Sequence, residues 1–118
     1  MFQILVVEDD NDLRNLFCKT LQRNSYRAFP AEDAENALQI LEQEHIDLMI
    51  TDIMMPGMDG FDLIRRLRET NQELPILIVT AKGDIYDKHT GFQAGTDDYM
   101  VKPIDLHELL LRINALLR

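Results

Sequence analysis

Short apolar runs alternate with amphipathic helical patterns five times along this chain, and no other feature restricts its fold as strongly. Each run is rich in β-prone residues and has the length of one strand. The helical patterns repeat apolar residues at spacings of three and four. Alternating β and α elements imply an α/β fold, in which helices cover both faces of a parallel sheet. The expected strands are residues 3–7, 26–31, 47–52, 75–79 and 98–101, and the expected helices are residues 12–24, 34–44, 60–70, 84–94 and 105–117.

The make-up of the strands indicates their places in the sheet. Residues 3–7, 47–52 and 75–79 are almost wholly apolar, which is typical of central strands that helices cover on both faces. Residues 26–31 include Arg27, which favours an edge position. In sheets of this kind, ligands bind outside the carboxyl ends of the strands.

The helical patterns predict both buried faces and helix starts. Asp33 and Asp59 are expected N-caps, because their carboxylates can accept hydrogen bonds from the first free backbone N–H groups. Asp105, with Glu108 three residues later, resembles a capping box. The inward face of the first helix is expected to comprise Leu13, Leu16, Phe17, Thr20 and Leu21.

Length and charge exclude several classes of protein. The chain has 118 residues, 46% of them hydrophobic, which suits one domain with one core. Its net charge of −9 argues against nucleic-acid binding through phosphate contacts but is compatible with a cation site. The single cysteine, Cys18, favours a reducing, cytoplasmic location. We expect no membrane association, because the sequence shows neither a transmembrane stretch nor a signal peptide.

Polar side chains follow four of the expected strands. Glu8 and Asp9 follow the first, Asp52 ends the third, Thr80 follows the fourth and Lys102 follows the fifth. If the strands are parallel, these groups meet at one edge of the sheet. Clustered carboxylates repel one another, and their oxygens suit a hard divalent cation such as Mg²⁺. Together with an ammonium and a hydroxyl group they form a phosphoryl site, in which one carboxylate can act as nucleophile.

Four stretches in this order resemble the receiver domain of two-component response regulators, of the OmpR/PhoB type. They are VVEDD at 6–10, DIMMPGMDG at 52–60, TA at 80–81 and GTDDYMVKP at 95–103. The resemblance runs from Gln3 to Leu117 and covers essentially the whole chain. It implies a flavodoxin-like (βα)5 fold, a doubly wound five-stranded parallel sheet with strand order 2-1-3-4-5.

The resemblance also implies a role for each residue of the site. Asp52 would accept a phosphoryl group from a sensor histidine kinase or a histidine phosphotransfer domain. Asp52 and Asp9 would bind Mg²⁺ directly, Glu8 would bind it through water, and Met54 would contribute its backbone carbonyl.

Other residues would bind the phosphoryl group and respond to it. Lys102 and Ala81 would contact the phosphoryl group, and the Lys102-Pro103 bond would be cis. Thr80 and Tyr99 would form the switch, with Thr80 moving toward the phosphoryl group and Tyr99 turning inward.

A homodimer surface is implied over residues 84–94, 98–101 and 105–117, to be formed after phosphorylation. Charged pairs are expected across a two-fold axis, Lys88 with Glu108 and Asp98 with Arg112. Phe92 and Leu111 would lie in the apolar centre of this surface. Asn114 departs from the pattern, since a basic residue there usually faces Asp97.

The function expected is a phosphorylation-dependent signalling switch and not a turnover enzyme. Residues 1–118 would be the receiver domain, and a DNA-binding output domain would lie outside this chain, so that this domain itself makes no nucleic-acid contact. The alternative is a stand-alone receiver or phosphorelay intermediate that acts through protein–protein contact. An aspartyl phosphatase is disfavoured, because Met54 stands where a second acid is needed. A flavin carrier is disfavoured, because Glu8 and Asp9 would repel a phosphate.

Overall fold

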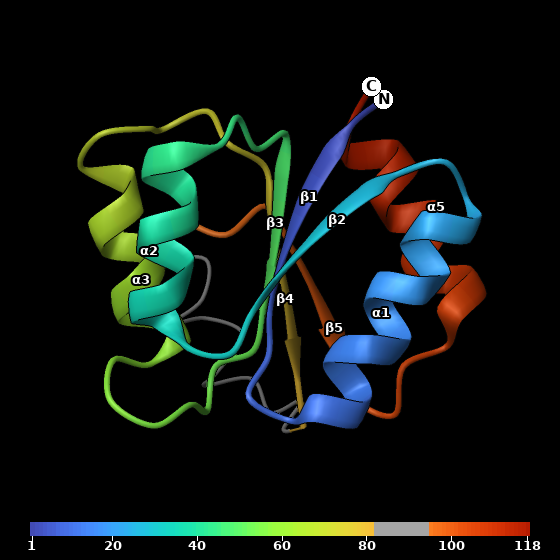
Figure 1. Ribbon diagram of the computed structural model, residues 1–118, viewed down its shortest axis with the longest axis horizontal. Coiled ribbons are helices and arrows are strands. Elements are labelled where there is room, and N and C mark those ends of the chain that lie inside the picture. Colours follow the sequence, from blue (N-terminus) through green and yellow to red (C-terminus); the bar gives the residue numbers. More distant parts are fainter. Residues whose placement is uncertain (82–94) are drawn as a thin grey trace.

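The computed structural model describes residues 1–81 and 95–118 as a five-stranded parallel sheet covered by helices on both faces. The strand order is β2-β1-β3-β4-β5, which confirms the predicted fold and the edge position of the second strand (Figure 1). All four strand pairs are parallel. The strands are β1 (Gln3–Val7), β2 (Arg27–Ala31), β3 (Leu48–Thr51), β4 (Ile76–Thr80) and β5 (Asp98–Val101).

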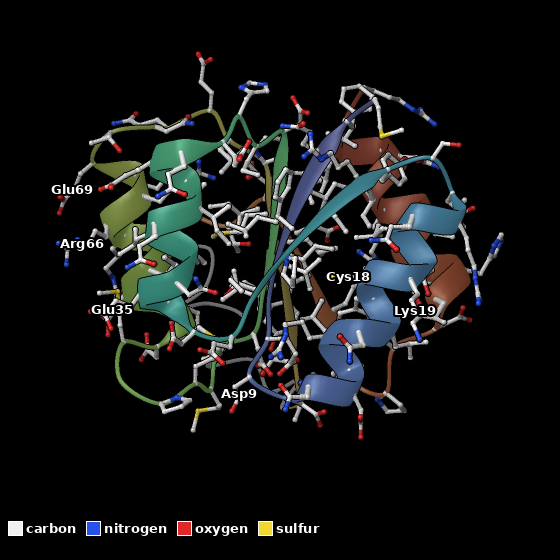
Figure 2. The ribbon with its side chains drawn as sticks, in the orientation of Figure 1. Asp9, Cys18, Lys19, Glu35, Arg66 and Glu69 are labelled. Carbon is white, nitrogen blue, oxygen red and sulfur yellow. The ribbon has the colours of Figure 1, made fainter. Side chains whose placement is uncertain are left out.

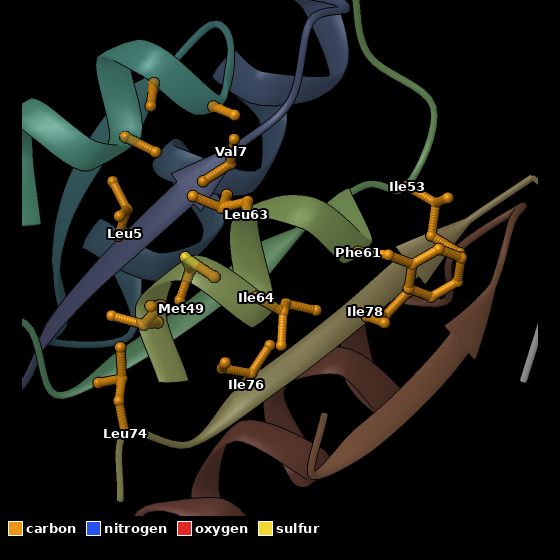
Figure 3. Packing of buried hydrophobic residues seen from close by; sticks show 14 of the residues in the cluster. Leu5, Val7, Met49, Ile53, Phe61, Leu63, Ile64, Leu74, Ile76 and Ile78 are labelled. Atoms are coloured by element: carbon orange, nitrogen blue, oxygen red, sulfur yellow. The ribbon is translucent and has the colours of Figure 1, made fainter. Parts of the chain in front are cut away.

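Among the described residues, helices lie on both sides of the sheet, and those on each side enclose one part of the core (Figure 1). Helices α2 (Ala34–Gln43) and α3 (Gly60–Arg68) cover one side, where Leu5, Met49 and Ile76 are buried beneath them (Figure 3). Helices α1 (Asn11–Arg23) and α5 (Leu106–Leu116) cover the other, over a second buried cluster. The helix expected at residues 84–94 lies outside the described residues.

Carboxylate caps start the helices as their positions predicted. Asp33 accepts a hydrogen bond from the backbone N–H of Asn36, and Asp59 accepts one from that of Asp62. Asp105 caps α5, but the carboxylate of Glu108 accepts from the Arg112 guanidinium. Only the Asp105 half of the expected capping box is therefore recorded. Most expected boundaries differ from the observed ones by one or two residues.

One prediction about the first helix was wrong. Leu16 was expected to face the core, but it is 45% exposed, whereas Cys18 is buried with Phe17 and Leu21. A helix advances by roughly 100° per residue, so a face centred between Phe17 and Leu21 includes Cys18 and leaves Leu16 on its outer margin. Across the described residues, no helix is long and apolar enough to cross a membrane.

Candidate functional site

Parallel pairing brings the predicted site residues to one edge of the sheet. Val7 pairs with Thr51 in the register of β1 and β3, and Thr80 pairs with Val101 in that of β4 and β5. The residues that follow these positions therefore emerge side by side. They are Glu8, Asp9, Asp52, Ala81 and Lys102.

Three carboxylates form the centre of the site. Glu8, Asp9 and Asp52 each place one oxygen within 4.8 Å of the others. Glu8 and Asp52 are only 2% and 6% exposed, while Asp9 is exposed at the rim where β1 ends (Figure 2). Water can therefore reach this group of acids from the side of Asp9.

Lys102 bridges the two buried acids. Its Nζ donates to Asp52 Oδ2 at 2.6 Å and to Glu8 Oε1 at 2.9 Å. Its backbone N–H donates to the carbonyl of Thr80 at 2.7 Å, which fixes the lysine to the end of β4. Charge-assisted hydrogen bonds of this kind are the stronger ones in proteins, so the ammonium holds both carboxylates in place.

Backbone N–H groups orient the remaining carboxylate oxygens. Asp52 Oδ1 accepts from the N–H of Ile53 at 2.6 Å and from that of Met54 at 3.4 Å. Glu8 Oε2 accepts from the N–H of Asp10 at 3.2 Å. The backbone that directly follows Asp52 thus holds one of its carboxylate oxygens, and Lys102 holds the other.

Burial shifts the proton equilibria of this group. The pKa of Glu8 rises to about 7, because burial penalises its charge, although the hydrogen bond from Lys102 opposes the shift. Burial lowers the pKa of Lys102, but its hydrogen bonds with Asp52 and Glu8 outweigh this effect and raise the pKa above its ordinary value. The ammonium is therefore stable between the two acids, whereas Glu8 resists full ionisation at neutral pH.

The donor set fits a divalent cation. Three carboxylates and one ammonium carry a net charge of −2 when all are ionised, which equals and opposes the charge of Mg²⁺. Two ligands on opposite sides of Mg²⁺ are about 4.2 Å apart, given metal–oxygen distances of about 2.1 Å. Carboxylate oxygens within 4.8 Å of one another suit binding that is partly direct and partly through water.

The other predicted site residues lie around this centre. Thr80 is 2% exposed and Tyr99 is 8% exposed, so both side chains point into the protein. Ala81 is exposed at the rim. The side chain of Met54 is directed outward with 71% exposure, which leaves its backbone close to Asp52. The Lys102–Pro103 peptide bond is cis, the geometry that the resemblance implies.

Part of the expected dimer surface is described. Arg112 pairs within its own chain, with Asp98 at 2.7 Å and with Glu108 at 2.9 Å. Leu111 is 56% exposed beside this network. Lys88 and Phe92 lie outside the described residues.

Sequence reasoning missed the partner of Asp97. Its carboxylate pairs with Arg68 at 3.0 Å, within the chain. Asn114, which replaces the basic residue expected opposite Asp97, accepts instead a hydrogen bond from the hydroxyl of Tyr26. No short-range pattern links residues 29 positions apart, so the sequence carried no signal for the Arg68–Asp97 pair.

A cavity of about 470 Å³ lies away from these acids, between the carboxyl-terminal ends of α2 and α3. It is lined partly by Leu41, Ile46 and Leu74, and none of the lining residues belongs to the acidic cluster. This cavity is therefore separate from the acidic cluster.

The sequence matches the response regulator receiver domain family over residues 4–114. The response regulator MprA of Mycolicibacterium vanbaalenii is 41% identical over 116 residues, which are 98% of this chain and 50% of that protein. MprA of Mycobacterium leprae is also 41% identical, over 98% of this chain and 51% of that protein. The chain thus spans about half the length of these relatives.

Solved structures agree with this match. The receiver domain of the Francisella response regulator 1452 superposes with a TM-score of 0.93 at 31% identity, covering 99% of this chain and 97% of that one. The response regulator TrrA of Thermotoga maritima, in complex with Mg²⁺-BeF, superposes with a TM-score of 0.90 at 31% identity, covering 98% and 99%. The chain therefore belongs to the family of response regulator receiver domains, the signalling modules of two-component systems.

Proposed function

We propose that Asp52 accepts a phosphoryl group from a phosphohistidine and holds it as a signal. One observation carries this proposal: the Lys102 ammonium lies 2.6 Å from Asp52 Oδ2, beside an acidic cluster that suits Mg²⁺. A positive group in this position can stabilise the charge on a phosphoryl group during transfer. The donor would be a sensor histidine kinase or a histidine phosphotransfer domain.

The transfer forms one bond and breaks one. A carboxylate oxygen of Asp52 attacks phosphorus, the P–N bond breaks, and the imidazole nitrogen keeps the electron pair and takes up a proton. Asp9 and Asp52 would hold Mg²⁺ directly, together with the backbone carbonyl of Met54, and Glu8 would hold it through water. When bound, the cation neutralises charge on the phosphoryl oxygens. Lys102 would leave its contact with Asp52 Oδ2 and bind these oxygens.

The phosphoryl group would change the surface of the domain through Thr80 and Tyr99. An acyl phosphate carries close to two negative charges and replaces one carboxylate charge, so the site gains about one unit. Lys102, Thr80 and the backbone of Ala81 would respond to the new oxygens. Both switch side chains are buried, Thr80 at the end of β4 beside β5 and Tyr99 within β5, so their rearrangement would reach the surface formed by β5 and α5.

The whole protein would be a transcription regulator. The MprA relatives are response regulators about twice as long as this chain, which supports a further output domain, proposed to bind DNA. Receiver dimerisation through residues 84–94, β5 and α5 would then bring two output domains together. The receiver itself, with its excess of acidic residues, would not contact the DNA. A cytoplasmic location accords with this role.

Incubation with acetyl phosphate and Mg²⁺ tests the central step. Intact-protein mass spectrometry should show a gain of one phosphoryl group in the wild type. Asp52→Asn should show no gain, because an amide oxygen is a poor nucleophile, and Asp9→Asn should show a slow gain, because it removes a metal ligand. A gain in Asp52→Asn equal to that of the wild type would assign the acceptor to another residue.

A further inference from the structure

The turn that leads into β5 is fastened to the end of helix α3 by one arginine. Arg68 donates to the carbonyl of Gly95 from Nε at 3.0 Å and from Nη2 at 2.7 Å. Nη2 also contacts Asp97 Oδ2 at 3.0 Å. The Arg68 side chain is 15% exposed and that of Asp97 is 45% exposed, so this network (Arg68, Gly95 and Asp97) holds a largely buried arginine at the edge of the protein surface.

The same turn is fastened to the start of β4. Asp97 Oδ2 accepts from the N–H of Ile76 at 2.8 Å, and the N–H of Asp97 donates to the carbonyl of Ile76 at 2.9 Å. The Thr96 hydroxyl donates to that carbonyl at 3.0 Å. The Asp97 carboxylate therefore joins α3, β4 and the start of β5 at a single point.

Gly95 makes this close contact with Arg68 possible. Its φ of +106° disfavours side chains, and a Cβ at this position would lie 3.1 Å from Arg68 Nε. The glycine thus meets both a conformational and a steric requirement of the Arg68 network.

Both ends of α3 are connected to the phosphoacceptor. At its start, the N–H of Gly60 donates to the carbonyl of Ile53 at 2.9 Å, and a Cβ on Gly60 would lie 2.2 Å from the backbone oxygen of Asp52. At its end, Arg68 holds the turn before β5, and Lys102 directly follows β5. Asp52 and Lys102 are therefore joined directly and also through α3.

Strand β5 depends on this second connection more than a central strand would. It has four residues and, within residues 1–81 and 95–118, lies at an edge of the sheet and pairs only with β4. The Arg68 network fixes its first end, and this in turn sets the position of Lys102 at the other end. In contrast, Glu8 follows β1 and Asp52 follows β3, and the network contacts neither of these strands.

We propose that Arg68 is a positioning residue for phosphoryl transfer, which seats β5 so that Lys102 reaches the phosphoryl group on Asp52. This inference rests on the proposed function of Asp52. Misplacing a catalytic group by about 1 Å can slow a reaction by about 100-fold. Loss of the network lowers the rate of phosphorylation and leaves the affinity for Mg²⁺ intact, because the metal ligands lie on other strands.

The test compares Arg68→Gln with Arg65→Gln in the same helix. Arg65 is the matched control, since its 53% exposed side chain pairs only with Asp62 at the surface among the contacts recorded. For each variant, the rate of phosphorylation by acetyl phosphate is measured below the unfolding transition, and the affinity for Mg²⁺ is measured by calorimetry. Arg68→Gln should slow phosphorylation about threefold to tenfold with unchanged Mg²⁺ affinity, and Arg65→Gln should change neither.

A second variant checks that the two partners act as a unit. Asp97→Asn should slow phosphorylation, and the double variant should be no slower than the slower single variant, because both changes break one network. If Arg68→Gln does not fold, Arg68→Lys, which keeps the charge but loses the two-pronged contact with Gly95, replaces it. Equal losses of rate and of Mg²⁺ affinity would show general loosening and overturn the proposal, as would a rate equal to that of the wild type.

NMR tests the positioning role of Arg68 independently of whether Asp52 is phosphorylated. The signals of residues 99–102 and of the Lys102 side chain should shift in Arg68→Gln and stay in place in Arg65→Gln, without any phosphoryl donor. If the wild type takes no phosphoryl group, the proposed function fails, and these signals alone decide whether Arg68 positions Lys102. Unshifted signals overturn the positioning role.

Discussion

At the scale of single residues, Glu8 illustrates how position decides chemistry. An acid at a strand end is ordinarily ionised at neutral pH, but burial raises the pKa of Glu8 from 4.5 to about 7. The folded protein therefore binds this proton more tightly than the unfolded chain does. The stabilisation is fully present below pH 4.5 and is lost as the pH rises toward 7 and beyond.

This shift predicts the pH dependence of stability without metal. In urea unfolding with a chelator present, the free energy of unfolding of the wild type should fall between pH 5 and pH 8 more steeply than that of Glu8→Gln. The raised pKa of Lys102 does not contribute in this window, since its stabilisation is lost only above the ordinary pKa of 10.5. Equal slopes for the two proteins would show that Glu8 titrates as it does in the unfolded chain.

At the scale of elements, two consecutive residues, Asp59 and Gly60, fix the position at which α3 begins. Asp59 caps the helix, and Gly60 passes so close to Asp52 that a Cβ would lie 2.2 Å from its backbone oxygen. The neighbouring Gly57 has a positive φ of +79° but open space around its Cβ position. The two glycines are therefore required for different reasons, steric at Gly60 and conformational at Gly57.

Alanine substitutions should distinguish these two reasons. Gly60→Ala should lose about 3 kcal/mol or more of folding free energy, because the obstacle is backbone and cannot swing away. Gly57→Ala should lose about 1–2 kcal/mol, the cost of a left-handed conformation for a residue with a Cβ. Urea denaturation measures both, and a smaller loss for Gly60→Ala than for Gly57→Ala would contradict the close packing of α3 on Asp52.

At the scale of the whole molecule, the proposed function predicts that phosphorylation of Asp52 changes the surface of α5 and promotes dimerisation. In the single chain, Arg112 is satisfied by Asp98 and Glu108, so pairing across a two-fold axis requires these contacts to exchange partners. Leu111 lies exposed beside them and is the described apolar residue best placed to be buried in an interface.

Two exposed leucines provide a matched comparison. With beryllium fluoride and Mg²⁺, sedimentation should show the wild type shifting to a dimer and Leu111→Asp remaining a monomer. Leu16→Asp, which places the same charge on α1 at a similarly exposed leucine, should dimerise like the wild type. If Leu111→Asp dimerises at the same protein concentration as the wild type, the interface does not include Leu111.

The sequence by itself determined the sheet, the caps and the acidic group. Apolar runs of strand length and helical spacing are local properties, and the parallel arrangement follows from their alternation. Glu8, Asp9, Asp52 and Lys102 were predicted to meet because each lies at or just after the carboxyl end of an expected strand. The resemblance to a family added the strand order and the expected switch residues.

Only the tertiary structure decided the contacts between distant segments. The exposure of Leu16, the bridge of Lys102 across two buried acids and the joining of α3 to β5 by Arg68 depend on how helices rotate and approach one another. Local patterns set which residues can be buried or charged, but packing selects the partners. The sequence identifies the polar residues at the strand ends, and the fold determines the distances between them.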